Sequence, residues 1–95
     1  MEDKTGKFDS QGTGFRMTFE NGYTISVQFG ACTYSDHYMT RREDLHNRKT
    51  VESSLAEVAI SKQVNGRLVW HLDPDEGAYK TPAEVAKLIA LAQAL

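Results

Sequence analysis

The sequence predicts an α+β fold, in which a four-stranded antiparallel sheet built from two hairpins carries one C-terminal helix on a face. Two Asn-Gly steps, Asn21-Gly22 and Asn65-Gly66, each separate segments in which apolar and polar residues alternate. This arrangement is typical of β-hairpins. Residues 81–95 instead combine helix-capping signals with helical spacing. With 95 residues in total, the chain is long enough for one small domain.

The first segment, residues 1–14, is polar, and we interpret it as a flexible N-terminal lead-in. A terminal strand around Phe8 is the alternative, because Phe8 could anchor this segment to a core. The single α+β domain is therefore expected to occupy residues 15–95, with a long loop at 30–53.

The first hairpin is expected within residues 15–29. A two-residue turn would place Phe19 opposite Thr24 and divide the apolar side chains between the two faces of the sheet. A three-residue loop with Gly22 in the left-handed region places Phe19 opposite Tyr23, and it collects every large apolar side chain on one face. We therefore expect a type I turn followed by a glycine bulge.

The second hairpin is expected within residues 55–72 and has the same turn chemistry. A three-residue loop would set Ile60 opposite Trp70, whereas a two-residue turn would set Ile60 opposite His71. The three-residue loop is favoured because it keeps the apolar residues together, and it predicts that Trp70 is buried beneath the helix.

The C-terminal helix is expected to begin after Thr81, a capping residue that is followed by proline and, three residues after the cap, by Glu84. Apolar residues then repeat at helical spacing and form one stripe, which is expected to lie across the apolar face of the sheet. The predicted core comprises Phe15, Met17, Phe19, Ile25, Val27, Val58, Ile60, Trp70, Leu88 and Ile89.

Composition and charge argue against several classes of function. Eleven Lys and Arg against thirteen Asp and Glu give a net charge of −2, which disfavours a dedicated nucleic-acid binder. The single cysteine, Cys32, cannot form an intramolecular disulfide or a multi-cysteine zinc site, and it fits a reducing compartment. Neither a membrane-spanning apolar run nor a signal peptide is evident, so we expect a cytoplasmic protein without a membrane partner.

Four residues of the central segment are of types that serve in catalysis or metal binding. A nucleophile, a general base and an orienting group could be supplied by Cys32, His37 and Asp36, respectively. However, no local signature of a cysteine enzyme surrounds these residues. Cys32, Asp36, His37 and His46 lack the tight spacing of a zinc site. We therefore expect no catalytic residue, no metal and no cofactor, and we interpret Cys32 as a half-buried small thiol.

Residues 30–53 form a segment too long for a simple link, and it could include a short helix over 40–47. Tyrosine and arginine often dominate interface energetics, so we predict a partner-binding loop, with a merely flexible insertion as the alternative. The predicted partner-binding residues are Tyr34, Asp36, His37, Tyr38, Arg41, Arg42, Arg48 and Lys49. An acidic turn supplies a secondary partner-binding set, suited to a basic surface: Asp73, Asp75 and Glu76.

Four stretches of the sequence carry a resemblance to known proteins: Phe19-Glu-Asn-Gly-Tyr-Thr-Ile-Ser-Val-Gln-Phe-Gly30, the Cys-Thr-Tyr-Ser-Asp segment that follows, Ala56-Glu-Val-Ala59 and Thr81-Pro-Ala-Glu-Val-Ala-Lys-Leu-Ile89. Together they resemble small uncharacterised proteins of bacteriophages and other mobile elements. The resemblance extends over residues 15–95. That group includes inhibitors of bacterial defence systems, anti-CRISPR proteins among them, which generally act by occupying a protein surface.

The resemblance implies a non-enzymatic protein-binding module that inhibits a host protein, such as a nuclease complex, in the bacterial cytoplasm. The module is expected to be a monomer or a homodimer. The alternative is a nucleic-acid or small-ligand binder that uses the basic, tyrosine-bearing loop at 34–49.

Overall fold

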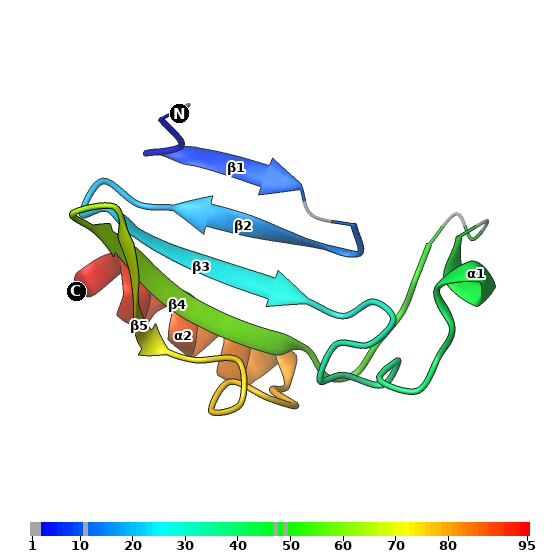
Figure 1. Ribbon diagram of the computed structural model, residues 1–95. Coiled ribbons are helices and arrows are strands. Elements are labelled where there is room, and N and C mark those ends of the chain that lie inside the picture. Colours follow the sequence, from blue (N-terminus) through cyan, green and yellow to red (C-terminus); the bar gives the residue numbers. More distant parts are fainter. Residues whose placement is uncertain (1–2, 11, 47, 49) are drawn as a thin grey trace.

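The computed structural model describes residues 3–10, 12–46, 48 and 50–95, which form a five-stranded antiparallel sheet with a long helix against it (Figure 1). The strands pair in chain order: β1 (Lys7–Ser10), β2 (Gly14–Thr18), β3 (Tyr23–Gln28), β4 (Glu57–Val64) and β5 (Arg67–Leu72). A short helix, α1 (Arg42–Leu45), lies between β3 and β4, and α2 (Pro82–Ala94) follows β5. The predicted fold class is confirmed, but the predicted number of strands, four, is wrong.

The additional strand, β1, lies in the segment that the sequence suggested was a lead-in. Phe8 pairs with Met17 of β2, and the Asp9 carboxylate lies 2.6 Å from the Arg16 guanidinium. Because Phe8 is 77% exposed, β1 is held by its backbone pairing with β2 and by this ion pair rather than by burial of an apolar side chain. The alternative of a strand around Phe8 is the one observed.

The first hairpin has the predicted register. Met17 lies opposite Ile25, and the N–H of Phe19 donates to the carbonyl oxygen of Tyr23 at 2.9 Å. Gly22 has a φ of 88°, and its N–H donates to the carbonyl oxygen of Phe19. The three-residue loop with a left-handed glycine is therefore confirmed.

The second hairpin does not use the predicted three-residue loop. Asn65 and Gly66 both have positive φ, 52° and 76°, which is the geometry of a two-residue type I′ turn. A β-bulge then shifts the register next to Ile60, which consequently lies opposite Leu72 rather than Trp70. The bulge keeps Ile60 and Leu72 together on the core face despite the shorter turn.

Trp70 is not buried beneath the helix as predicted. It lies opposite Ser61, which follows the buried Ile60 in β4 and therefore faces the other side of the sheet. The Trp70 side chain is 47% exposed. The prediction failed because a bulge reverses the alternation of one strand relative to its neighbour, and residue alternation alone does not locate a bulge.

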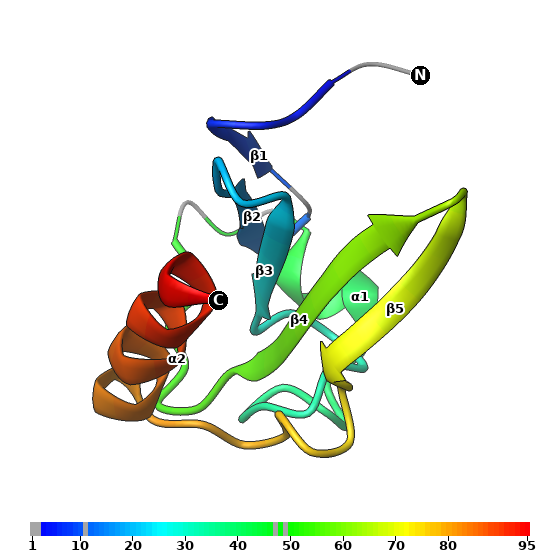
Figure 2. The ribbon, with the colours of Figure 1, turned by 90° about the vertical axis from the view of Figure 1, so that its left-hand side faces the viewer.

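Helix α2 covers one face of the sheet, while the β4–β5 hairpin extends away from it (Figure 2). Ile25, Val58 and Ile60 are fully buried at the centre of the core. The predicted core is confirmed except for Trp70, since the remaining predicted residues are buried or packed against the buried cluster. None of the described helices is long and apolar enough to cross a membrane.

The N-terminus of α2 has the predicted capping box. The N–H of Glu84 donates to the Thr81 hydroxyl at 3.3 Å, and the N–H of Thr81 donates to the Glu84 carboxylate at 3.0 Å. This hydrogen bond from the Thr81 backbone is the main reason that the pKa of Glu84 lies below its ordinary value. The cap fixes where the helix begins.

The C-terminus of α2 is held by the turn of the first hairpin. The side-chain amide of Asn21 lies 2.8, 3.2 and 3.1 Å from the carbonyl oxygens of Ala92, Gln93 and Leu95. The Asn21 side-chain oxygen also accepts the N–H of Tyr23 at 2.9 Å. One turn residue therefore satisfies carbonyl groups that the end of a helix leaves without partners.

Candidate functional site

The connection between β3 and β4 has two halves that pack against different parts of the fold (Figure 1). The first half, around residues 31–38, contacts the turn after β5. The second half contains α1 and faces residues 12–14 and the end of β3 across a shared depression. The predicted partner-binding residues are thereby divided between two separate surfaces.

Tyr34 anchors the first half to the sheet. Its N–H donates to the Glu57 carboxylate of β4 at 3.0 Å, and its carbonyl oxygen accepts the N–H of Tyr79 at 3.0 Å. Both bonds use backbone groups of Tyr34. Its half-buried ring is therefore oriented by the two rings that it contacts, those of Tyr38 and Tyr79.

Three tyrosine rings meet at this point, and we call Tyr34, Tyr38 and Tyr79 the tyrosine cluster. Tyr34 stacks on Tyr38 with ring centroids 5.4 Å apart and an interplanar angle of 18°, and it lies 5.8 Å from the ring of Tyr79. Tyr38 and Tyr79 remain 43% and 47% exposed. The cluster therefore presents aromatic surface to solvent on a rigid base.

The acidic turn adjoins the tyrosine cluster. A hydrogen bond to the Asp75 carboxylate is the main reason that the pKa of Tyr34 lies above its ordinary value. Asp73 and Glu76 shape the turn instead, since the Asp73 carboxylate accepts the N–H of Glu76 at 2.9 Å. Two surfaces that the sequence suggested were separate, the loop and the acidic turn, therefore share one patch.

Gly77 makes this arrangement possible. Its carbonyl oxygen accepts the N–H of Val58 at 2.8 Å, which docks the acidic turn against β4. A Cβ atom at Gly77 would overlap the carbonyl oxygen of Val58. The close backbone approach that brings Asp75 and Tyr79 to Tyr34 consequently requires glycine.

Asp36 and His37 hold the loop closed. The Asp36 carboxylate accepts the N–H of Ser54 at 2.7 Å and its hydroxyl at 2.8 Å, and these bonds lower the pKa of Asp36. The His37 ring lies 2.6 Å from the carbonyl oxygen of Glu52 and 3.3 Å from the Thr40 hydroxyl. The side chains of these two predicted partner-binding residues thus form hydrogen bonds within the connection between β3 and β4.

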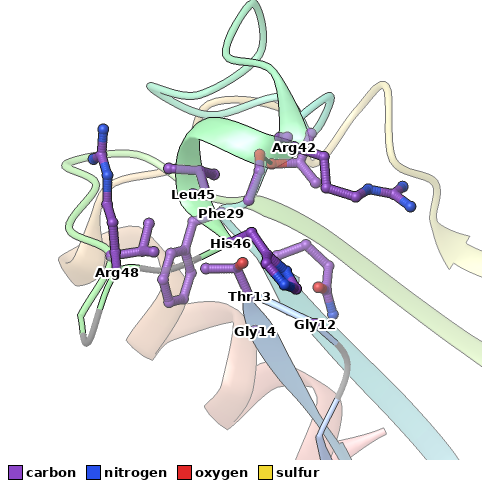
Figure 3. A pocket seen from close by; sticks show the side chains of 13 residues that line it. Gly12, Thr13, Gly14, Phe29, Arg42, Leu45, His46 and Arg48 are labelled. Atoms are coloured by element: carbon purple, nitrogen blue, oxygen red, sulfur yellow. Dashed lines mark hydrogen bonds between the residues drawn. The ribbon is translucent and has the colours of Figure 1, made fainter.

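The second half of the loop borders an open depression of about 830 Å³, shown in Figure 3. Its other wall is the 12–14 turn, and Arg42, His46 and Arg48 contribute its basic side chains. In Figure 3 the two guanidinium groups point away from each other, with the imidazole between them. The basic groups do not converge on one point.

Arg41, the other described basic residue of this half, is exposed. The Arg41 guanidinium lies 3.3 Å from the Asp44 carboxylate, and Arg48 donates to the carbonyl oxygen of Asp44 at 3.1 Å. The predicted short helix over 40–47 is observed as α1, which lies inside that range. Lys49 and Asn47 lie outside the described residues.

Cys32 is exposed rather than half-buried, which corrects the interpretation from the sequence. Its φ of 64° places it in a tight bend, and its N–H donates to the carbonyl oxygen of His37 at 3.3 Å. In the part of the chain that the structure describes, no three His, Cys, Asp or Glu side chains are grouped to hold a metal ion.

Sequence reasoning missed Tyr79, the third member of the tyrosine cluster. The available signal was the spacing of Gly77 and Tyr79 directly after the acidic turn, which links an aromatic residue to the secondary partner-binding set.

Comparison with protein-family models, curated proteins and solved structures finds no match to this chain.

Proposed function

We propose that the protein is a non-enzymatic protein-binding module whose contact surface is the tyrosine cluster together with Asp75. The observation that carries this proposal is the stack of tyrosine rings, half exposed, with a carboxylate at its edge. Tyrosine contributes large contact area at low entropic cost and is enriched at the centres of interfaces. Hydrogen bonds from both sides hold the cluster in place before a partner binds.

The chemistry of this patch favours a basic partner surface. Aromatic faces attract the cationic groups of arginine and lysine, and the Asp75 carboxylate can form an ion pair with the same side chain. The neighbouring Asp73 and Glu76 add negative charge, which steers a basic partner toward the patch. An arginine that stacks on Tyr38 or Tyr79 and reaches Asp75 fits all of these features.

The second candidate is a nucleic-acid or small-ligand binder, and the depression lined by Arg42, His46 and Arg48 is the observation that favours it. However, the tyrosines that could stack on bases lie beside the acidic turn and not beside these arginines. Phosphates that followed bases onto the tyrosine cluster would meet carboxylates, which is unfavourable.

We further propose that the partner is a bacterial host protein, such as a component of a defence nuclease, and that binding inhibits it. Support for this comes from the resemblance of the first hairpin, the loop and the closing helix to proteins of mobile elements. The tyrosine cluster supplies the kind of surface that such an inhibitor needs.

The test is affinity capture from a nuclease-treated bacterial lysate with immobilised protein. Asp75→Lys reverses the charge beside the tyrosines, and we expect it to abolish capture of the partner. Glu43→Lys makes the same charge change in α1, on the other half of the loop, and is expected to capture as well as the wild type.

Two results would contradict the proposal. One is equal capture by Asp75→Lys. The other is capture that occurs only from an untreated lysate, is absent from the nuclease-treated one and falls steeply with salt. This dependence is the signature of phosphate contacts and would favour the nucleic-acid binder.

A further inference from the structure

β5 is an edge strand, and three of its four apolar residues are half-exposed. Its only paired neighbour among the described strands is β4, and in Figure 2 it forms the border of the sheet on the side away from α2. Leu68, Val69 and Trp70 are 49%, 49% and 47% exposed. Three consecutive half-exposed apolar residues on a sheet edge are a template for pairing with another strand.

The opposite edge of the sheet is protected in a way that β5 is not. β1 has four residues, and two of them, Lys7 and Asp9, are charged. Short strands and charged side chains are the usual means by which proteins block an edge. β5 has six residues, and of Lys, Arg, Asp and Glu it carries only Arg67, next to the turn, so the contrast indicates an edge that is kept open.

The register of the second hairpin shows which backbone groups β5 offers. Val64 and Arg67 flank the two-residue turn and pair with each other. In an antiparallel ladder, residues alternate between pairs that exchange both hydrogen bonds and pairs that exchange none. Counting from the turn, Leu68 and Trp70 direct their N–H and C=O groups away from β4.

We propose that two copies of this chain pair through β5, antiparallel, about a two-fold axis at Val69. In this register Leu68 of one copy lies opposite Trp70 of the other, and the reverse pairing occurs across the axis. The residues with outward-directed backbone groups thus pair with each other, and the arrangement is self-complementary, as a two-fold interface requires.

Side chains and charge also fit a second copy. Leu68 and Trp70 lie on one face of the sheet, so both copies contribute them to a single apolar cluster, while the two Val69 side chains meet on the other face. Arg67 falls opposite His71, so no carboxylates face each other, and the net charge of −2 gives little repulsion between copies.

One strand pair buries less than the roughly 1,200 Å² of a standard interface, so the association is expected to be weak and concentration-dependent. Sedimentation velocity over about 5 to 500 μM spans the affinity range of such interfaces. The wild type should shift from monomer to dimer, and the emission of Trp70 should move to shorter wavelength over the same range because the indole becomes less hydrated.

Val69→Glu is the decisive variant. Within its own sheet the new carboxylate lies opposite Lys62, so the fold is retained, but across the axis two carboxylates meet. We expect association at least tenfold weaker. Val64→Glu is the matched control, since it places the same side chain opposite Arg67 on β4, away from the edge, and should associate like the wild type.

A mixture of Val69→Glu and Val69→Lys should associate again, because the axis then brings opposite charges together. A wild type that stays monomeric throughout, Val69→Glu that dimerises like the wild type, or a folded mixture that stays monomeric would each overturn the proposal. Tyr38→Ala with Tyr79→Ala should leave dimerisation unchanged, which separates this interface from the tyrosine cluster.

Discussion

The clearest energetic test of the fold concerns Asn21, which joins the first hairpin to the end of α2. Asn21→Ala removes the amide that lies 2.8 Å from the Ala92 carbonyl oxygen and the side-chain oxygen that accepts the Tyr23 N–H. Each lost hydrogen bond costs about 1 kcal/mol, so the free energy of unfolding should fall by about 2 kcal/mol. For a chain of this size that corresponds to roughly 8–15 °C in melting temperature.

Asn21→Asp separates the two contacts of Asn21. The carboxylate still accepts the N–H of Tyr23, but it faces the carbonyl oxygens at the negative end of α2 instead of donating to them. We therefore expect Asn21→Asp to lose at least about 2 kcal/mol, as much as the alanine variant. Urea unfolding followed by circular dichroism measures this loss, with an unchanged m-value showing that only stability has changed.

The matched control is Asn65→Asp. Asn65 precedes the glycine of the second hairpin in the same Asn-Gly step, but it is exposed and lies in a turn away from α2. Its substitution should change stability by no more than about 0.5 kcal/mol. Should Asn21→Asp prove equally neutral, Asn21 would act only as a turn residue and the inferred link between hairpin and helix would be refuted.

Three further outcomes follow from the structure. Gly77→Ala should lower the free energy of unfolding by more than about 1 kcal/mol in urea, because the new Cβ overlaps the carbonyl oxygen of Val58; a neutral change would contradict the close approach. Trp70→Ala should lower the free energy of unfolding by about 1 kcal/mol or less in the same assay, because the half-exposed side chain makes only cross-strand contacts. A loss of roughly 3 to 5 kcal/mol, as for a buried tryptophan, would instead place Trp70 in the core. The folded pKa of Tyr34 is raised by Asp75, so this contact stabilises the protein fully below the pKa of unfolded tyrosine and is lost as pH rises through the folded pKa. Spectrophotometric alkaline titration should show one tyrosine that ionises late, and Asp75→Asn should bring its pKa back toward the ordinary value; an unchanged titration would exclude the contact.

The two hairpins show how far sequence patterns determine register. Residues 15–29 carry large apolar side chains at every second position on both strands, so a single register places them all on one face, and that register is observed. In the second hairpin a type I′ turn and a bulge next to Ile60 jointly reach the core pairing with Leu72. The alternation of apolar residues depends on the combined register shift of the turn and the bulge, and it does not show where each of them lies. The prediction for Trp70 was wrong for this reason.

The candidate site was predictable in its parts but not in its assembly. Composition pointed to Tyr34 and Tyr38, and charge pointed to Asp75, because each feature is local in the sequence. Their association depends on the backbone approach of Gly77 to β4, which brings together residues about forty positions apart. No local pattern encodes such a contact, and Tyr79 was missed for the same reason.

The central claim is that the tyrosine cluster, rather than the basic half of the loop, binds the partner. The most direct test is the dissociation constant of the captured partner, measured by titration calorimetry for two double variants. Tyr38→Ala with Tyr79→Ala should raise it at least tenfold, about 1.4 kcal/mol, and Arg42→Ala with Arg48→Ala should leave it within about twofold of the wild type. The opposite ranking, with the arginine variant impaired and the tyrosine variant unaffected, would contradict this account.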